Sequence, residues 1–301
     1  MPSIVVAIPC YNEEKTIAKV IQDFKRILPE AQIYVFDNNS TDASVYLAQQ
    51  AQVKLIKVRK QGKGHVLQAM FESISCDALV CVDGDDTYCA EDVTKLLSPI
   101  LSGEADMVVG DRLKNANAQS IVQLHQIGNR LIVNTINYVF KTQFEDILSG
   151  YRVFSRHFQK NVPLITPGFE IETELTLQAL EAGMVVEEIP VGYRKRPTDS
   201  VSKLRPFRDG LRIMFTAAML LRDHYPLRLY GAISLGCFSV AVVAAILKIM
   251  PSHGGIHETF LAGLILLFVP MSAIALGMAL ILSAVNTRLK EMNQLNKRNR
   301  H

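Results

Sequence analysis

The sequence predicts an α/β domain with a mostly parallel sheet, followed by two helices that are long enough to cross a membrane. Three observations predict this fold class. Short apolar runs alternate with helical patterns over roughly the first third of the chain, polar loops follow the runs, and residues 229–247 and 259–287 contain no Asp, Glu, Lys or Arg. Continuous apolar strands that alternate with helices are typical of a sheet covered on both faces.

The elements of the α/β domain are expected in a regular order. Five apolar or β-branched runs are expected as strands: Ile4–Ile8, Ile33–Phe36, Val53–Val58, Ala78–Val82 and Met107–Val109. Four segments between them are expected as helices: Glu14–Leu28, Asp42–Gln50, Lys63–Ser75 and Ala90–Leu101. A domain of about 200 residues plus an appendage accounts for the length of the chain.

The two uncharged stretches predict a membrane hairpin, because about 20 apolar residues cross a bilayer. Two buried core helices are the alternative. Basic residues lie before the first stretch and after the second, whereas the connector 251–258 has no Lys or Arg. Since basic residues mark the cytoplasmic side, we expect a multi-pass integral membrane protein with the α/β domain and both termini in the cytoplasm.

An amphipathic helix is expected just before the hairpin. Apolar side chains recur at helical spacing between Pro206 and Tyr225, with several arginines around them. Such a helix suits an anionic membrane surface, although packing on the α/β domain is the alternative. The expected boundaries are 1–204 for the α/β domain, 205–228 for this helix, 229–287 for the hairpin and 288–301 for a basic tail.

Charge and cysteine content limit the partners. The net charge of +3 indicates a bias toward the membrane surface and gives little reason to expect nucleic acid. The N-terminus does not resemble a signal peptide, since its apolar run is short and Glu13 and Glu14 follow it. The five cysteines show no C-x-x-C spacing and are assigned no function.

Polar loops follow four of the five expected strands, namely Pro9–Glu13, Asp37–Ser40, Asp83–Asp86 and Gly110–Arg112. Ligands of open α/β sheets bind beyond the carboxyl ends of the strands, so we expect these loops to converge on one site. Turn chemistry alone can place Asn, Asp and Gly in any single loop. The joint occurrence favours a binding site.

The Asp83-Gly84-Asp85 triplet predicts a divalent metal site. Two carboxylates at the end of a buried strand repel each other unless a cation holds them, and Mg²⁺ binds one or two carboxylates together with substrate phosphates. Mn²⁺ suits the same oxygen ligands. We expect Asp85 to bridge the metal to a diphosphate and Asp83 to assist or to hold a ribose, with Gly84 allowing close backbone approach. The triplet alone is common.

The motifs in order resemble the family 2 inverting glycosyltransferases with a GT-A fold, a Rossmann-like architecture. Four motifs carry the resemblance: Ile8–Glu13, Asp37–Asp42, Gly62–Gly64 and Asp83–Asp85. Asp146–Arg152 (DILSGYR) and Arg196–Lys203 (RPTDSVSK) narrow it to the polyprenyl- or dolichol-phosphate branch. The resemblance covers residues 3–210 and implies metal-dependent transfer of a sugar from a UDP- or GDP-sugar to a polyprenyl phosphate.

The resemblance implies a donor site built from several loops. Pro9, Tyr11, Glu13 and Asp37 would line the nucleoside pocket, and Lys63 would approach a phosphate. Turn, cap or packing roles are the alternatives for the first four, and a solvated lysine is the alternative for Lys63. The family usually has two consecutive acids where this chain has Asp37 and Asn38, and it often has Gln where this chain has Thr87. Asp86 or Thr87 is then the expected third metal ligand, or else a helix cap.

The resemblance also implies an acceptor site and a closing loop. Arg112, Arg130, Asn134 and Arg152 are expected to hold the acceptor phosphate, since the arginine fork matches phosphate oxygens; surface salt bridges are the alternative for Arg112 and Arg130. Residues expected to close over the donor diphosphate are Arg196, Ser202 and Lys203, with Lys203 counted as catalytic.

Asp85 and Asp146 complete the expected catalytic set. A phosphate monoester is largely dianionic at neutral pH, because its second pKa is about 6, and it can attack without a general base. Asp146 is therefore expected to orient the sugar or the acceptor, or else to play a structural part by holding Arg152.

Two other functions stay open. Transfer to a glycan or another lipid, as in processive polysaccharide synthases, usually requires a Q-x-x-R-W motif, and this chain has no Trp. The second is a non-catalytic membrane scaffold, and the intact set of acidic and basic motif residues argues against it. The sequence does not decide whether the chain forms a homo-oligomer.

Overall fold

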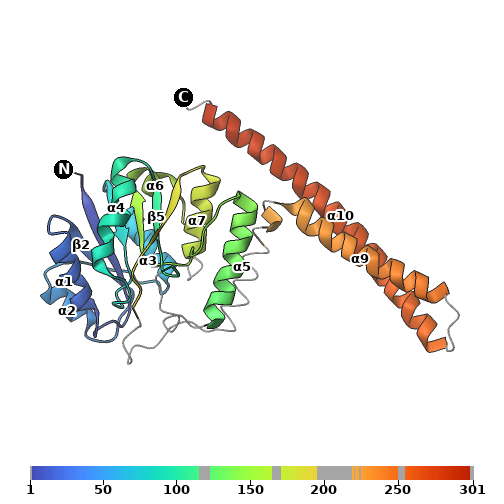
Figure 1. Cartoon of the computed structure of the whole chain (residues 1–301), viewed down its shortest axis with the longest axis horizontal. Coiled ribbons are helices and arrows are strands. Elements are labelled where there is room, and N and C mark those ends of the chain that lie inside the picture. The colour runs from blue at the N-terminus through green and yellow to red at the C-terminus, as the bar shows by residue number, and fades with distance from the viewer. Residues whose placement is uncertain are drawn as a thin grey trace. The chain divides into compact units, whose positions relative to one another are not determined.

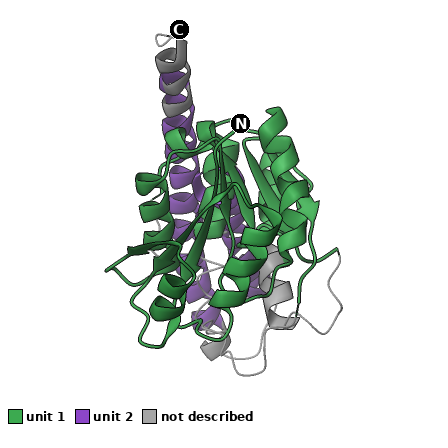
Figure 2. Ribbon diagram, turned by 90° about the vertical axis from the view of Figure 1, so that its left-hand side faces the viewer, with its two compact units in different colours: residues 1–213 green, residues 214–301 purple. Residues whose placement is uncertain are grey.

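The computed structural model describes residues 2–114, 123–164, 171–194, 219, 221–223, 225–249 and 255–298. The chain divides into two compact units, residues 1–213 and 214–301, which Figure 2 colours separately. Most of the amphipathic helix expected at 205–228 lies outside the described residues, as do Arg196, Ser202 and Lys203.

The first unit contains a seven-stranded sheet with the strand order β3-β2-β1-β4-β6-β5-β7. The strands are β1 (Ile4–Cys10), β2 (Gln32–Asp37), β3 (Lys54–Lys57), β4 (Ala78–Cys81), β5 (Met107–Asp111), β6 (Arg152–Ser155) and β7 (Val186–Pro190). Only β6 runs antiparallel to its neighbours in this sheet. The prediction of a mostly parallel sheet is confirmed, and all five expected strands are present.

Helices cover both faces of the sheet (Figure 1). They are α1 (Ile17–Ile27), α2 (Ser44–Gln50), α3 (Lys63–Ser73), the short η1 (Ala90–Asp92), α4 (Val93–Ser102), α5 (Gln123–Phe140), α6 (Arg156–Asn161) and α7 (Ile171–Glu181). The four expected helices agree with α1 to α4, with shifted ends.

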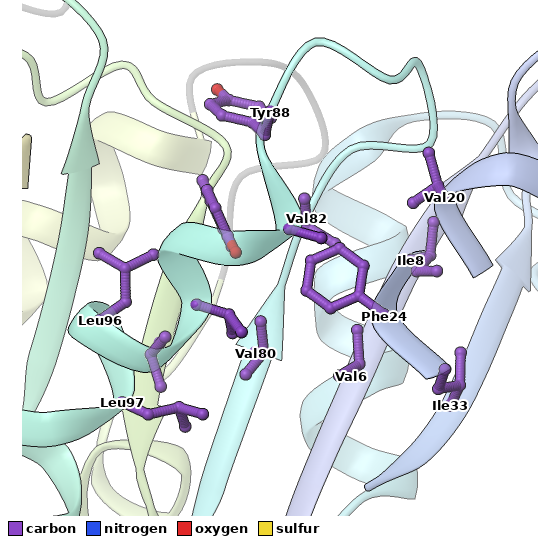
Figure 3. Close-up of a cluster of buried hydrophobic side chains, with 14 of the residues drawn as sticks. Val6, Ile8, Val20, Phe24, Ile33, Val80, Val82, Tyr88, Leu96 and Leu97 are labelled. Carbon is purple, nitrogen blue, oxygen red and sulfur yellow. The ribbon is translucent and has the colours of Figure 1, made fainter. Parts of the chain in front are cut away.

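Two apolar clusters fix this layering. Successive strand side chains point to opposite faces, so Val6 and Ile8 of β1 join one cluster while Val5 and Ala7 join the other. Figure 3 shows the first cluster, in which Phe24 of α1 lies among the strand side chains. Because these apolar side chains are buried in the core, the polar side chains that could form a binding or catalytic site lie in the loops at the strand ends.

The two long helices described in the second unit are α9 (Pro226–Ile249) and α10 (Gly255–Arg298). Pro226–Ile249 and Glu258–Arg288 are each long and apolar enough to cross a membrane. Ser234 and Ser272 join the helices, since each hydroxyl donates to the other residue's carbonyl oxygen, at 2.9 and 3.0 Å. Large apolar side chains stay exposed, including Leu266 at 80 %. Such a continuous apolar surface is costly in water and favourable in lipid.

Arg152, the first residue of β6, is buried inside the first unit with only 1 % of its surface exposed. Its guanidinium donates to the carbonyl oxygens of Ser149 and Ile147 and to the Thr176 hydroxyl of α7. Burial lowers the pKa of this guanidinium despite nearby acids. A buried guanidinium bound to backbone carbonyls does not favour the expected acceptor-phosphate role of Arg152, which stays a prediction.

Replacing Arg152 by Met should destabilise the first unit by about 3 kcal/mol, because two buried carbonyl oxygens lose their donor. Thermal unfolding followed by tyrosine fluorescence measures this loss, since the chain has no Trp. Arg26→Met is the control, because the Arg26 side chain is 63 % exposed. An equal loss of stability in both variants would contradict the structural role.

Candidate active site

The loops after β1, β2 and β4 are hydrogen-bonded to one another, as the sequence led us to expect. The Asn12 backbone N–H donates to the Ser40 hydroxyl at 3.0 Å, and the Glu13 N–H donates to the Ser44 hydroxyl at 2.8 Å. The Thr16 hydroxyl donates to the Gly84 carbonyl oxygen at 2.6 Å. Three loops that are far apart in the sequence thus form one edge.

The two acids expected to line a nucleoside pocket are buried at this edge. Glu13 is 9 % exposed and Asp37 is 2 % exposed, and the Asp37 carboxylate accepts the Ser40 backbone N–H at 3.0 Å. Pro9 and Tyr11 are half-buried. The structure therefore brings all four residues to the same loop cluster, while their contact with a nucleoside stays a prediction.

Asn38 explains one departure from the family pattern. Its amide donates to the carbonyl oxygens of Val58 and Lys60, and its own carbonyl oxygen accepts the Gly62 N–H at 2.8 Å. A carboxylate has no N–H and could not make the first two bonds. Asn38 therefore ties the β2 loop to the segment that begins α3.

Asp83 lies in a chain of alternating charges. The Lys63 ammonium is 2.7 Å from an Asp83 oxygen and 2.7 Å from an oxygen of Glu172 on α7. Burial alone lowers the pKa of Lys63, but the two carboxylates outweigh burial and raise that pKa well above its usual range. Lys63 thus neutralises Asp83, and its expected approach to a phosphate stays a prediction. The sequence held no signal for Glu172.

Gly150 lies directly against this pair. A Cβ at this position would collide with an Asp83 carboxylate oxygen and lie 2.8 Å from the Lys63 nitrogen. Gly84, in contrast, has room for a Cβ at ordinary contact distances of 3.4 Å. A larger residue at 150 would therefore have to displace the ends of these two side chains, whereas the expected need for Gly84 depends on a ligand.

Asp85 and Asp86 have different surroundings. Asp85 is 4 % exposed, and one of its oxygens accepts the Thr87 hydroxyl at 2.6 Å. Asp86 has a left-handed backbone conformation, with φ of 58°, and pairs with the Lys19 ammonium at 2.6 Å and with Arg194 at 3.7 Å. These cations hold Asp86, which does not favour the expected third-ligand role.

The donor set suits a metal that also binds substrate. Among the residues that the structure describes, no group of three or more His, Cys, Asp and Glu side chains is arranged to hold a metal ion. Asp83 and Asp85 supply two carboxylates at the end of β4, and Mg²⁺ commonly takes its remaining oxygen ligands from substrate phosphates and water. The two aspartates fit this mode of binding.

Arg112 and Asp146 form a buried, two-pronged ion pair. Two nitrogens of the Arg112 guanidinium donate to the two Asp146 oxygens at 2.6 and 2.8 Å, and the Arg112 backbone N–H adds a third bond at 3.2 Å. Asp146 has no exposed surface, whereas the Arg112 side chain is 20 % exposed. Burial raises the pKa of Asp146, but Arg112 outweighs burial and the net pKa is lowered. Asp146 therefore stays ionised.

Tyr193 connects this ion pair with the metal loop. The Arg112 guanidinium lies 5.5 Å from the centre of the Tyr193 ring. Tyr193 pairs with Tyr88 in an isolated β-bridge, and the next residue, Arg194, donates its N–H to the Thr87 carbonyl oxygen at 2.7 Å. The segment that precedes the expected closing loop is thus fastened beside Asp85. Sequence reasoning missed Tyr193.

Two further acids, Glu188 of β7 and Asp111 of β5, belong to the surroundings of Asp146. The Glu188 carboxylate accepts the backbone N–H groups of Glu145 and Asp146 at 2.7 and 2.8 Å. Asp111 has no exposed surface, and its Oδ2 has no hydrogen-bond partner. Burial raises the pKa of Glu188 to about 7 and also raises that of Asp111. Sequence reasoning missed Glu188, although a buried-strand pattern with two adjacent acids is an unusual signal.

Two further expected acceptor residues lie on α5. Arg130 and Asn134 are both exposed and stand one helical turn apart. They are available to a ligand, but no described contact ties them to Arg112, so their acceptor role stays a prediction.

Two proteins of Haloferax volcanii are similar to this chain over most of its length. Glycosyltransferase AglJ of Haloferax volcanii is 32 % identical over 97 % of this chain and 98 % of its own length. A dolichyl-phosphate hexose transferase of the same organism is 28 % identical over 70 % of this chain and 90 % of its own length.

The fold also matches a solved structure. Glucosyl-3-phosphoglycerate synthase from Mycobacterium tuberculosis, in complex with Mn²⁺, UDP-glucose and phosphoglyceric acid, superimposes with a TM-score of 0.57 and 22 % identity, covering 73 % of this chain and 79 % of that one. This likeness shows the GT-A fold. Residues 5–161 match the family described as Glycosyl transferase family 2. The chain therefore belongs to glycosyl transferase family 2.

Proposed function

We propose that this glycosyltransferase moves a sugar, with inversion, from a UDP- or GDP-sugar to a polyprenyl phosphate at the cytoplasmic face of a membrane. The observation that carries the proposal is the Arg112–Asp146 pair beside the metal loop, joined to it by Tyr193. A guanidinium held there suits an acceptor that is itself a phosphate. The two candidate spans and the name of the dolichyl-phosphate relative favour a lipid as its carrier.

The donor side of the proposal uses the acidic loops. Asp85 and Asp83 would hold Mg²⁺ or Mn²⁺ together with the donor diphosphate, while Glu13, Asp37, Pro9 and Tyr11 would surround the nucleoside. When bound, the metal stabilises the negative charge that develops on the departing diphosphate. Lys203, with Arg196 and Ser202, closes over the same diphosphate.

The acceptor side needs no general base. An oxygen of the dianionic phosphate forms the bond to the anomeric carbon, and the bond from that carbon to the donor diphosphate breaks, with its electron pair leaving on the nucleoside diphosphate. Asp146 accepts three N–H groups of Arg112 and has a lowered pKa, so it is poorly suited to take a proton. Its proposed role is to orient Arg112, with Arg130 and Asn134 further along the acceptor path.

Asp85→Ala should lower kcat on the order of 100-fold, because the leaving diphosphate loses its metal-held stabilisation. The assay incubates membranes with Mg²⁺, polyprenyl phosphate and labelled UDP- or GDP-sugars, and measures label in an organic-extractable lipid. Glu72→Gln, an exposed change on α3, is the control. Unchanged labelling by Asp85→Ala, or no labelled lipid from any donor with the wild type, would overturn the proposal.

Arg112→Lys should raise the KM for polyprenyl phosphate at least about tenfold and leave the donor KM nearly unchanged, because lysine cannot reproduce the two-pronged guanidinium bond. Steady-state rates at varied acceptor concentration measure this effect. Arg156→Lys is the matched control, since Arg156 forms a surface pair with Asp77 at 3.3 Å. A selective rise in the donor KM would argue against the acceptor role.

The proposed topology predicts the labelling of introduced cysteines. An impermeant maleimide should label Ser252→Cys in the connector of intact cells, because this connector faces away from the cytoplasm. Asn299→Cys in the basic tail should react only after the membrane is permeabilised. The reverse pattern would refute the proposed orientation.

A further inference from the structure

Glu188 reaches the acceptor site through a sequence of hydrogen bonds that begins on β7. Its two carboxylate oxygens accept the backbone N–H groups of Glu145 and Asp146, which are more than 40 residues away in the sequence. The side chain of Asp146 then binds the Arg112 guanidinium through two further bonds. Among the three charged groups, Arg112 is the one proposed to contact substrate.

We propose that Glu188 is a positioning residue for the acceptor phosphate: its carboxylate fixes the Glu145–Asp146 backbone and thereby sets the orientation in which Asp146 presents Arg112. This inference rests on the proposed function of the Arg112 site. Hydrogen bonds to a charged acceptor are stronger than neutral ones, so the ionised form of Glu188 holds this backbone more firmly than the neutral form.

Asp111 gives the arrangement a dependence on pH. Val109 of β5 lies opposite Glu188 in the parallel register, and Asp111 follows Val109 by two residues on the same face. Asp111 and Glu188 are therefore diagonal neighbours on the sheet. The unpartnered Oδ2 of buried Asp111 leaves its charge poorly compensated. Burial, together with Asp111 and Asp146, raises the pKa of Glu188 to about 7.

Other charged groups lie on the elements around Glu188. They are Arg112 and Lys114 after β5, Glu145 and Asp146 before β6, Arg152 on β6, and Glu172, Glu174 and Glu181 on α7. Arg112 is bound to Asp146, Lys114 is 3.6 Å from Glu145, and Arg152 donates to backbone carbonyls. Removing the charge of Asp111 should thus lower the pKa of Glu188 without breaking any of these ion pairs.

Glu188→Gln tests the proposal directly. Glutamine keeps one oxygen acceptor and loses the charge, so the KM for polyprenyl phosphate should rise about tenfold at pH 8, with the donor KM unchanged. The neighbouring change Glu187→Gln on the same strand is the matched control and should leave both constants unaltered. An unchanged acceptor KM in Glu188→Gln, or equal effects of the two variants, would overturn the proposal.

The pH profile separates positioning from a general structural role. In the wild type, kcat/KM for the acceptor should fall as pH drops through about 7, where Glu188 takes up a proton. In Asp111→Asn this fall in kcat/KM should occur at lower pH. In Glu188→Gln the only fall left should be the one caused by protonation of the acceptor phosphate, whose second pKa is about 6. If Asp111→Asn does not shift the fall in kcat/KM to lower pH, the proposal is contradicted, even where Glu188→Gln fails to fold.

A stability measurement distinguishes failure of this inference from failure of the proposed function. Folding raises the pKa of Glu188 from 4.5 to about 7, so the folded protein takes up a proton between these values. The wild type should therefore lose stability relative to Glu188→Gln as pH rises through this window. This pH dependence of stability can be measured without substrate. A wild type that transfers no sugar but shows this pH dependence would overturn the proposed function alone. An active wild type whose stability does not change with pH in this window, and whose kcat/KM does not fall below pH 7, would overturn the Glu188 proposal alone.

Discussion

The segment from Glu145 to Arg152 is the constraint on which the acceptor half of the site depends. Removing an ion pair such as Arg112–Asp146 from water is costly, and the cost is offset only when the geometry is good and the remaining polar atoms are satisfied. Glu188 holds one end of the segment by two backbone N–H groups, and Arg152 holds the other end through the carbonyls of Ile147 and Ser149. The buried aspartate is therefore fixed from both sides.

Two charged networks meet at this segment without sharing a side chain. The donor network joins Glu172, Lys63 and Asp83, and the acceptor network joins Glu188, Asp146 and Arg112. Gly150 touches the first network and Asp146 belongs to the second. The five residues from Asp146 to Gly150 therefore link the proposed site of the leaving group with the proposed site of the attacking phosphate, which suits a reaction whose two oxygens must lie on opposite sides of one carbon.

The sequence allowed prediction of the sheet's first five strands, because their apolar runs are continuous and lie between clear helical patterns. It missed β6 and β7, since β6 is four residues long and begins with Arg152, and since β7 contains two adjacent acids. The motifs located Asp83, Asp85, Arg112 and Asp146. Their partners Glu172, Glu188 and Tyr193 depend on contacts between distant segments, which no local pattern records. The burial of Arg152 could not be predicted either, because an arginine bound to backbone carbonyls looks, in sequence, like one that binds phosphate.

The missing side chain at Gly150 has a consequence for substitution at this position. The floor beneath Asp83 and Lys63 is backbone alone, and even an added methyl group would force the pair apart. A substitution at this position would therefore act on the Lys63–Asp83 pair, by shifting the ends of its two charged side chains. The loop held by Asn38 depends instead on one side chain, and a change there alters three hydrogen bonds at once.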